Sequence, residues 1–193
     1  MTGQPASHES LPDGLTGLTV RGVEIIDALA DLYGELHVVQ VEAVGERLHA
    51  PARTVADAWA QRRETYRQWL EAGGFVVAAE GGDDIAAFAI VGITSGYAGW
   101  DVGAALGEVK DFVVGRAWRR RGVGRALLGV VASELADRGI AHWRLNVVVG
   151  NDDAVAFYRR EGFDLTAVTL TGPPRTVMQR SPPGRTEARG SDG

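Results

Sequence analysis

The feature of this sequence that most constrains its fold is a β-prone run, a turn rich in arginine and glycine, and an apolar-faced helix in direct succession. The β-prone run covers residues 108–114, and the turn contains Arg119-Arg120-Arg121-Gly122. The helix is expected at 122–137, because Val123, Leu127, Val131 and Leu135 fall on one face, and Gly139 stops it. This order of elements is typical of mixed α/β proteins.

The remaining periodicities extend this pattern to a whole domain. Helices are predicted around Ile25–Leu36, from the N-cap Thr54 to Gly73-Gly74, and at 152–160. Gly81-Gly82-Asp83-Asp84 predicts a hairpin between two strands. Seven strands are expected in all, at 18–20, 75–80, 85–94, 108–114, 143–149, 163–170 and 175–179. The fold class is α/β (α+β), with a mixed central sheet of about six to seven strands flanked by four helices, and parallel crossings around the third helix.

Length and composition indicate one folded domain. The chain has 193 residues, which favours a single unit, predicted at 17–180 between a flexible N-terminal tail (1–16) and a disordered C-terminal tail (181–193). With no cysteine, disulfides and thiolate chemistry are excluded. A net charge of −5 disfavours nucleic acid or an anionic membrane as partner. No secretory signal and no membrane-spanning run are visible, so a cytoplasmic protein is expected.

The turn before the third helix has the chemistry of an anion site. Free backbone N–H groups and the positive end of the helix dipole meet there, and the arginines add charge. A P-loop is excluded because Arg125 and Ala126 stand where Lys and Ser or Thr are needed. A dinucleotide fingerprint is weak because Leu127 replaces its third glycine. The turn is therefore either a phosphate or pyrophosphate site, or an ordinary solvated turn.

Two linked motifs favour the first alternative. Arg119, Gly122 and Gly124 resemble the [QR]-x-x-G-x-[GA] loop of the GNAT superfamily of N-acetyltransferases. At the expected distance, residues 151–163 resemble the family's second motif, N-x-x-A-x-x-x-Y-x-x-x-G-F, at every named position. The resemblance is strong over 108–163 and is limited to the order of elements over 18–179. It implies a GNAT fold and acetyl-CoA or coenzyme A as co-substrate, with no metal.

The resemblance also implies the residues that contact this co-substrate. The strand backbone would bind the pantetheine arm and the thioester carbonyl, the turn amides the pyrophosphate, and the motif asparagine the cofactor arm. The implied binding residues are Phe112, Val113, Val114, Arg119, Arg120, Arg121, Gly122, Val123, Gly124, Arg125, Asn151, Ala154 and Tyr158.

Two catalytic residues are expected. By resemblance, Tyr158 protonates the departing thiolate, and the alternative is a core aromatic at helical spacing. The base that deprotonates the amine is expected to be Glu108, which shares strand parity with Phe112 and Val114. Asp111 is the second candidate for the base. Alternatively, a water chain removes the proton, and the carboxylates only pair with arginine or face solvent.

Other polar and aromatic residues carry less information. The histidines lack metal-ligand spacing, so no metal site is expected. Trp59, Tyr66 and Trp69 are expected in the core. Tyr97 and Trp100, in the glycine-rich loop 95–103, could line an acceptor pocket or pack a loop or dimer seam.

The function predicted from these features is acetyl transfer from acetyl-CoA to a primary amine of a small molecule, by direct attack in a ternary complex. The acceptor could be an aminoglycoside-like or other cationic amine, and a homodimer is compatible with the sequence. Three alternatives remain open: a non-catalytic acyl-CoA sensor, a protein N-terminal or lysine acetyltransferase, and an enzyme with a longer acyl donor.

Overall fold

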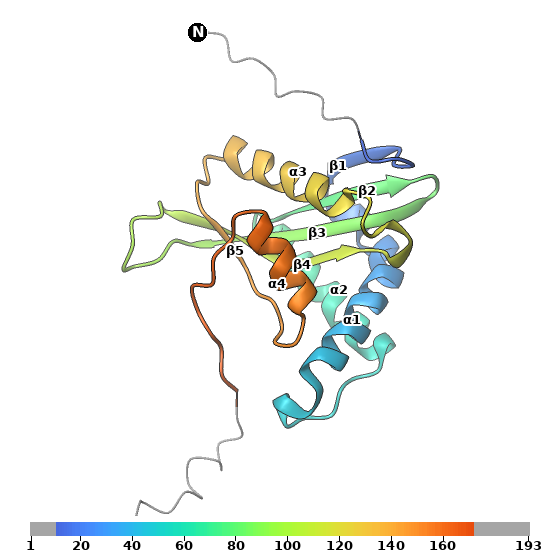
Figure 1. The fold of residues 1–193 in the computed structure, drawn as a ribbon. Coiled ribbons are helices and arrows are strands. Elements are labelled where there is room, and N and C mark those ends of the chain that lie inside the picture. The colour runs from blue at the N-terminus through green and yellow to red at the C-terminus, as the bar shows by residue number, and fades with distance from the viewer. Residues whose placement is uncertain (1–10, 172–193) are drawn as a thin grey trace, which may run out of the picture.

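The computed structural model, which describes residues 11–171, has one five-stranded sheet between two helical layers (Figure 1). The strands are β1 (Gly17–Arg21), β2 (Phe75–Gly81), β3 (Asp84–Ser95), β4 (Ala105–Val114) and β5 (Trp143–Leu145), in the spatial order β1-β2-β3-β4-β5. All neighbours are antiparallel except β4 and β5, which are parallel. The predicted mixed sheet, its hairpin and its parallel crossing around the third helix are confirmed.

Four α-helices flank the sheet. The helices are α1 (Ala30–Val44), α2 (Val55–Glu71), α3 (Val123–Asp137) and α4 (Asp152–Arg160). A 3-10 turn, Val23–Leu29, precedes α1, and the helices α1 and α2 cover one face of the sheet with a core around Tyr66 and Phe88. The other face is covered by α3, and all four residues of its predicted apolar stripe are buried.

Local sequence signals account for the helix ends. The hydroxyl of Thr54 accepts a hydrogen bond from the Asp57 N–H at 3.1 Å and caps α2 as predicted. Asn151 caps α4 in the same way, through its side-chain oxygen and the Ala154 N–H. Gly139 takes a φ of +72° after α3, a conformation that favours glycine.

The prediction of six to seven strands is wrong for the described residues, which form five. The strand expected at 143–149 is reduced to Trp143–Leu145, and residues 163–170 form no strand. Leu165, Val168 and Leu170 are exposed there, so β-prone residues alone, without a paired strand or a packed face, do not make a strand. The strand expected at 175–179 lies outside the described residues.

The predicted domain boundaries are only partly covered by the structure. Residues 1–10 and 172–193 lie outside the described part, so both tails stay predictions. Within 11–16, Leu15 is buried, and the Thr16 N–H donates to the Glu80 carbonyl at 2.8 Å. Over the described residues, none of the helices is both long and apolar enough to cross a membrane.

Candidate active site

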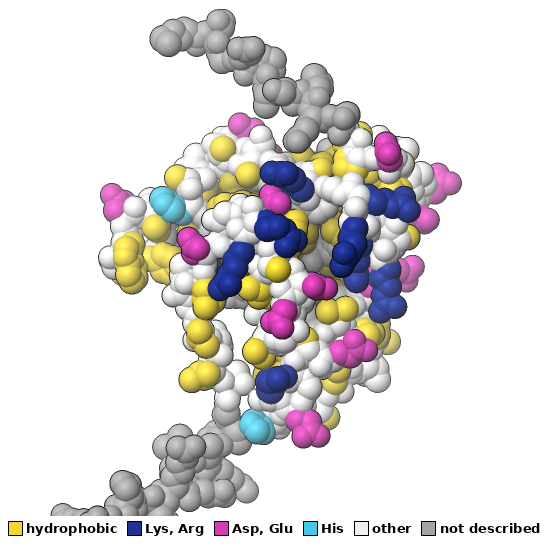
Figure 2. Space-filling model, in the orientation of Figure 1, with side chains coloured by type: hydrophobic (Ala, Val, Ile, Leu, Met, Phe, Trp, Pro, Cys, Tyr) yellow, Lys and Arg dark blue, Asp and Glu magenta, His cyan; other side chains and the backbone are white. Residues whose placement is uncertain are grey.

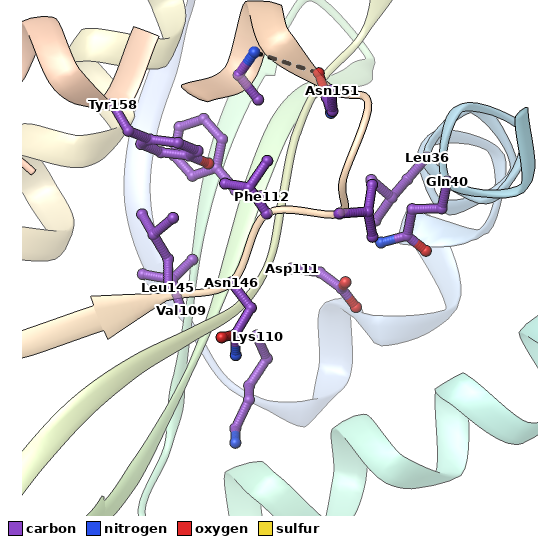
Figure 3. A pocket seen from close by; sticks show the side chains of 13 residues that line it. Leu36, Gln40, Val109, Lys110, Asp111, Phe112, Leu145, Asn146, Asn151 and Tyr158 are labelled. Carbon is purple, nitrogen blue, oxygen red and sulfur yellow. Dashed lines mark hydrogen bonds between the residues drawn. The ribbon is translucent and has the colours of Figure 1, made fainter. Parts of the chain in front are cut away.

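The sheet opens between β4 and β5, and a cavity of about 80 Å³ lies in the opening (Figure 3). The two strands pair over three residues only, from Gly107 with Trp143 to Val109 with Leu145. The chain after Leu145 then leaves β4 on its way to α4. The lining comes from α1, β4, β5 with the segment that follows it, and α4: Leu36, Gln40, Val109, Lys110, Asp111, Phe112, Leu145, Asn146, Val147, Val148, Asn151, Ala154 and Tyr158.

The backbone of β4 presents polar groups to this opening. The Gly115 N–H donates to the Ala86 carbonyl at 2.9 Å, which assigns Gly115 to the β3 side of the strand. By alternation Val113 also faces β3, whereas Phe112 and Val114 turn their N–H and C=O groups toward the side that β5 has left. Of the three strand residues that the resemblance implies for cofactor binding, Phe112 and Val114 thus have outward-facing backbone groups, whereas those of Val113 face β3.

The turn between β4 and α3 is built as the sequence predicted. Gly122 precedes the helix with a φ of +82°, and Arg120 takes a left-handed φ of +61°. The Ala126 N–H is the first to bond within the helix, to the Gly122 carbonyl, so the N–H groups of Val123, Gly124 and Arg125 are free of helical partners. Lys and Arg side chains gather on the face of the molecule that carries the start of α3 and α4 (Figure 2).

The arginines of the turn differ in their engagement. The exposed Arg119 is bonded to β4, because its Nε donates to the Val114 carbonyl at 2.9 Å. Arg121 stacks on Trp118, and Arg125 pairs with Glu161 at 3.3 Å. Arg120 is exposed. Arg119 thus ties the turn to β4, and the other three line the outside of the turn.

The turn and the cavity adjoin each other through two aromatic rings. A Cβ added at Gly124 would lie 3.4 Å from Cζ of Phe157 and 3.7 Å from Cε1 of Phe112, and the Phe112 and Phe157 rings pack together. Val123 is buried in the core beneath them. The 3.4 Å and 3.7 Å separations are ordinary van der Waals distances, so a Cβ at Gly124 fits beside the rings, whereas a longer charged side chain would test packing as well as anion binding.

Tyr158 has a packed ring and a free hydroxyl. The ring contacts Phe112, Phe157 and Phe163 in tilted or edge-on arrangements. Burial raises the pKa of Tyr158 above its usual value, so it is protonated at neutral pH. Within the described part of the chain its hydroxyl makes no hydrogen bond, and it lines the cavity. The side chain thus forms part of a packed cluster and still offers an unused proton to the opening.

Asn151 and Ala154 form the α4 wall of the cavity. The side-chain oxygen of Asn151 accepts from the Ala154 N–H at 3.2 Å (Figure 3). This bond gives Asn151 a capping role that the sequence resemblance did not indicate. Its side-chain amide N–H₂ group is not used by the cap and is the part that a cofactor could contact.

The strand parity predicted for Glu108 is wrong, because β4 contains a β-bulge. Ile90 pairs with Asp111, whereas Val91 pairs with Val109, and Lys110 is the extra residue. Val109 therefore packs with Phe112 and Val114 on the α3 face. Glu108 alternates with Val109 and faces away from them.

Glu108 belongs to an ion-pair cluster beside the cavity. Its carboxylate accepts from Arg144 at 2.9 Å and pairs with Lys110 at 3.0 Å, while Asn146 donates to its other oxygen at 3.4 Å. Burial alone would raise the pKa of Glu108, but the bonds from Arg144 and Lys110 outweigh burial and hold the pKa below its usual range. Glu108 is not among the lining residues.

Asp111 lies in the cavity wall. The Tyr66 hydroxyl donates to its Oδ2 at 2.7 Å, and Nε of Arg62 lies 3.6 Å from the same oxygen. Burial raises the pKa of Asp111, which Arg62 and the hydrogen bonds oppose only in part. The structure therefore brings Tyr158, Phe112, Asn151, Ala154 and Asp111 to one cavity and leaves Glu108 outside it.

Sequence reasoning missed several residues of this cavity. Leu36 and Gln40 come from the far part of the first helix, and no local signal links them to β4. Tyr66 was expected only as a core aromatic, and its bond to Asp111 depends on the packing of α2. Lys110 lines the cavity because of the bulge in β4. No glycine or proline at this position indicates the bulge in the sequence.

The aromatic residues of the loop 95–103 and the histidines are not among the residues that line the cavity. Tyr97 accepts a hydrogen bond from Arg144 at 3.0 Å, and Trp100 is exposed. His37 contacts the Arg53 carbonyl at 3.0 Å. Across residues 11–171, no group of three or more His, Asp or Glu side chains is placed to hold a metal ion.

Comparison with known proteins identifies the family. The sequence model of the family described as "Acetyltransferase (GNAT) family" matches residues 42–163, which is more than half of the chain and includes β4, the turn, α3 and α4. The chain belongs to the acetyltransferase (GNAT) family. This confirms the family membership that the two motifs predicted, and the family is one of acyltransferases.

Two curated members of this family match part of the chain. A mycothiol acetyltransferase of Geodermatophilus obscurus is 32% identical over 120 residues, which is 62% of this chain and 37% of that protein. A mycothiol acetyltransferase of Thermobifida fusca is 36% identical over 106 residues, which is 54% of this chain and 32% of that protein. The match thus spans about a third of the length of these relatives.

Solved structures of the GNAT family share the fold. A predicted acetyltransferase with acetyl-CoA from Clostridium acetobutylicum has a TM-score of 0.63 at 14% identity, over 81% of this chain and 95% of that one. An aminoglycoside N-acetyltransferase in complex with CoA has a TM-score of 0.60 at 16% identity, over 86% of this chain and 99% of that one. At sequence identities of 14% and 16%, the similarity shows a shared fold and nothing more.

Proposed function

We propose that this chain transfers an acetyl group from acetyl-CoA to the primary amine of a small molecule. The observation that carries the proposal is the opening between β4 and β5. There, Phe112, whose backbone N–H and C=O face away from β3, and Tyr158, whose hydroxyl has no partner among residues 11–171, line one cavity. The start of α3 lies next to Phe112, because a Cβ at Gly124 would lie 3.7 Å from the Phe112 ring. Two solved structures of the same fold contain acetyl-CoA or CoA, which supports the co-substrate.

The residues fit the anionic part of the co-substrate at one end of the opening. The free amides of Val123, Gly124 and Arg125 would bind the pyrophosphate, with Arg120 and Arg121 adding positive charge. The N–H of Phe112 or Val114 would donate to the thioester carbonyl oxygen and stabilise negative charge that develops there. Asn151 would contact the pantetheine arm through its side-chain amide.

The two sides of the sheet supply the two proton-transfer groups. Asp111, which faces α2, takes the proton from the incoming ammonium, and the amine nitrogen then attacks the thioester carbonyl carbon. When the C–S bond breaks, the sulfur takes the Tyr158 proton and the nitrogen loses its second proton to solvent water. Solvent then reprotonates Tyr158 and takes the proton from Asp111, so one proton is released per turnover. We assign the base to Asp111 instead of Glu108, because Asp111 lines the cavity and Glu108 is held by two cations.

A small-molecule acceptor is supported by the names of the relatives. The curated relatives are mycothiol acetyltransferases, and one structural neighbour is an aminoglycoside N-acetyltransferase. A protein N-terminus or lysine is the alternative acceptor, since one structural neighbour is a ribosomal-protein-alanine N-acetyltransferase.

The experiment that tests the co-substrate is calorimetry with CoA, acetyl-CoA, ATP and NAD on the full chain. We expect CoA and acetyl-CoA to bind, and ATP and NAD to bind much more weakly. Equal binding of NAD, or no CoA binding at millimolar concentration, would refute the co-substrate.

Catalysis is tested by following CoA thiol release with a library of amines. Release that depends on an amine supports transfer. Tight CoA binding with no release for any amine or N-terminal peptide would instead support the non-catalytic sensor.

A further inference from the structure

The charged side chains of the cavity wall suggest a substrate class. Among the described lining residues only two carry charge, Lys110 and Asp111, and they are of opposite sign. Consecutive residues of a regular strand point to opposite faces of the sheet. Here the bulge turns both toward α2: Lys110 Nζ lies 5.1 Å from the centre of the Trp69 ring, and Asp111 accepts from Tyr66.

The charges around this pair leave a surplus of positive charge. One oxygen of Glu108 is shared by Nζ of Lys110 at 3.0 Å and by Arg144 at 2.9 Å, so one carboxylate serves two cations. Asp111 has Arg62 as its cation. The cluster of Arg62, Glu108, Lys110, Asp111 and Arg144 therefore contains three cations and two carboxylates.

Two cations of this cluster also have N–H groups without a hydrogen-bond acceptor among the described residues. The Nε of Arg144 is buried and has no hydrogen-bond partner among residues 11–171. Lys110 has three ammonium protons, and one carboxylate oxygen lies within ion-pair distance of it. Arg144 is not a lining residue, so the donor with spare capacity that a ligand in the cavity can reach is Lys110, and a ligand that supplies an acceptor oxygen is favoured there.

We propose that the acceptor is a primary amine that carries its own carboxylate, with its amine facing Asp111 and its carboxylate facing Lys110. This proposal rests on the proposed acetyl transfer and names the class of its substrate. A polycationic amine, such as an aminoglycoside, meets one carboxylate in the cavity wall and a surplus of cations around it, so it is a poor acceptor.

The first experiment compares acceptors that differ only in the carboxylate. The common L-α-amino acids, β-alanine and 4-aminobutyrate are each assayed beside their carboxamides for acetyl-CoA-dependent thiol release. We expect kcat/KM to be about 10- to 100-fold higher for the preferred acid than for its carboxamide. Equal or higher values for the carboxamides, or for an aminoglycoside, would overturn the proposal while leaving acetyl transfer in place.

A second measurement does not depend on turnover. The N-acetylated acids and N-acetylated carboxamides are titrated into the CoA-loaded protein by calorimetry. Binding of the acids but not the carboxamides supports the proposal, and the absence of any difference overturns it. Acetyl transfer itself fails on different results: either CoA does not bind, or CoA binds and no amine of any class is acetylated.

Two variants of the same charge change locate the subsite. Lys110→Met keeps the aliphatic stem over Trp69 and removes the ammonium, so the acid-to-carboxamide ratio should fall toward one. Arg63→Gln on α2 is the control, because Arg63 pairs with the exposed Asp27 at 3.6 Å and is not a lining residue. The ratio should be unchanged in this control, and an unchanged ratio in Lys110→Met would contradict the assignment.

Discussion

At the scale of single residues, the two buried tyrosines of the site differ in the use of their hydroxyl groups. The Tyr66 hydroxyl donates to the buried Asp111 at 2.7 Å, whereas the Tyr158 hydroxyl faces the cavity without a partner in the described chain. Tyr158→Phe should therefore lower single-turnover acetylation by about 10²–10³-fold, with CoA affinity and melting temperature near wild type.

Tyr66→Phe is the matched variant, because it removes the same atom from a bonded hydroxyl. It should lower the free energy of unfolding by about 1–3 kcal/mol, measured by denaturant titration. If Tyr158→Phe behaves like Tyr66→Phe, or turns over at the wild-type rate, Tyr158 is a structural residue and not the acid.

Asp111 and Glu108 are distinguished by the pH dependence of turnover. Asp111→Asn should lower kcat/KM by about 10²–10⁴-fold and remove the acidic limb of the pH–rate profile, because the proton acceptor is lost. Glu108→Gln should retain that limb, since Glu108 lies outside the cavity lining. A profile that loses its acidic limb only in Glu108→Gln would assign the base to Glu108.

The same two carboxylates should affect stability with opposite signs. The pKa of Glu108 is lowered on folding, so Glu108 contributes stability above its ordinary value of 4.5, and the contribution is lost as the pH falls through the lowered pKa. The deficit of Glu108→Gln at pH 7 should thus shrink in acid. The pKa of Asp111 is raised above 3.8, so its contribution is lost as the pH rises through the raised pKa. Denaturant titrations between pH 3 and 7 measure both trends, and parallel curves for the two variants would contradict them.

At the scale of elements, the turn before α3 combines strain with anion binding. Arg120 has a backbone φ of +61°, a value that residues other than glycine rarely adopt. Arg120→Gly should raise the free energy of unfolding by about 0.5–1 kcal/mol and weaken CoA binding, because it removes the strain and a cation together. Calorimetry and denaturant titration measure the two effects.

His49→Gly is the control for this prediction. His49 has a φ of +53° in the loop before α2 and is not a lining residue of the cavity. The substitution should relieve similar strain without changing CoA affinity. Unchanged affinity in Arg120→Gly would mean that this arginine does not contact the anion.

At the scale of the whole molecule, net charge and local charge have opposite signs. The chain carries a net charge of −5, yet cations gather on the face with the start of α3 (Figure 2). CoA affinity should therefore fall about three- to tenfold as salt rises from 0.01 to 0.5 M, because the Debye length shortens from about 30 Å to a few ångströms. Pantetheine, which lacks the phosphates, is the control ligand and should show no such decline. A salt-independent Kd for CoA would argue against an electrostatic pyrophosphate site.

The sequence by itself determined the elements whose signals are local. The apolar stripe and Gly139 define α3, Thr54 starts α2, and the two-residue turn Gly82-Asp83 connects β2 and β3, because capping, periodicity and turn chemistry act within a few positions. The turn before α3 followed from the same kind of signal, and its motif together with the second motif at residues 151–163 predicted the family correctly.

The tertiary structure decided which residues meet, and here the bulge in β4 mattered most. One extra residue, Lys110, interrupts the alternation of the strand, so Glu108 lies on the face opposite Phe112, and Lys110 lies on the same face as Asp111 and lines the cavity with it. Strand pairing is a long-range property, which also explains why the β-prone residues 163–170 form no strand without a partner. The composition of the wall, with Gln40 of α1 and Asn146 after β5 beside β4, depends on packing between segments about 35 to 70 residues apart, which local patterns do not encode.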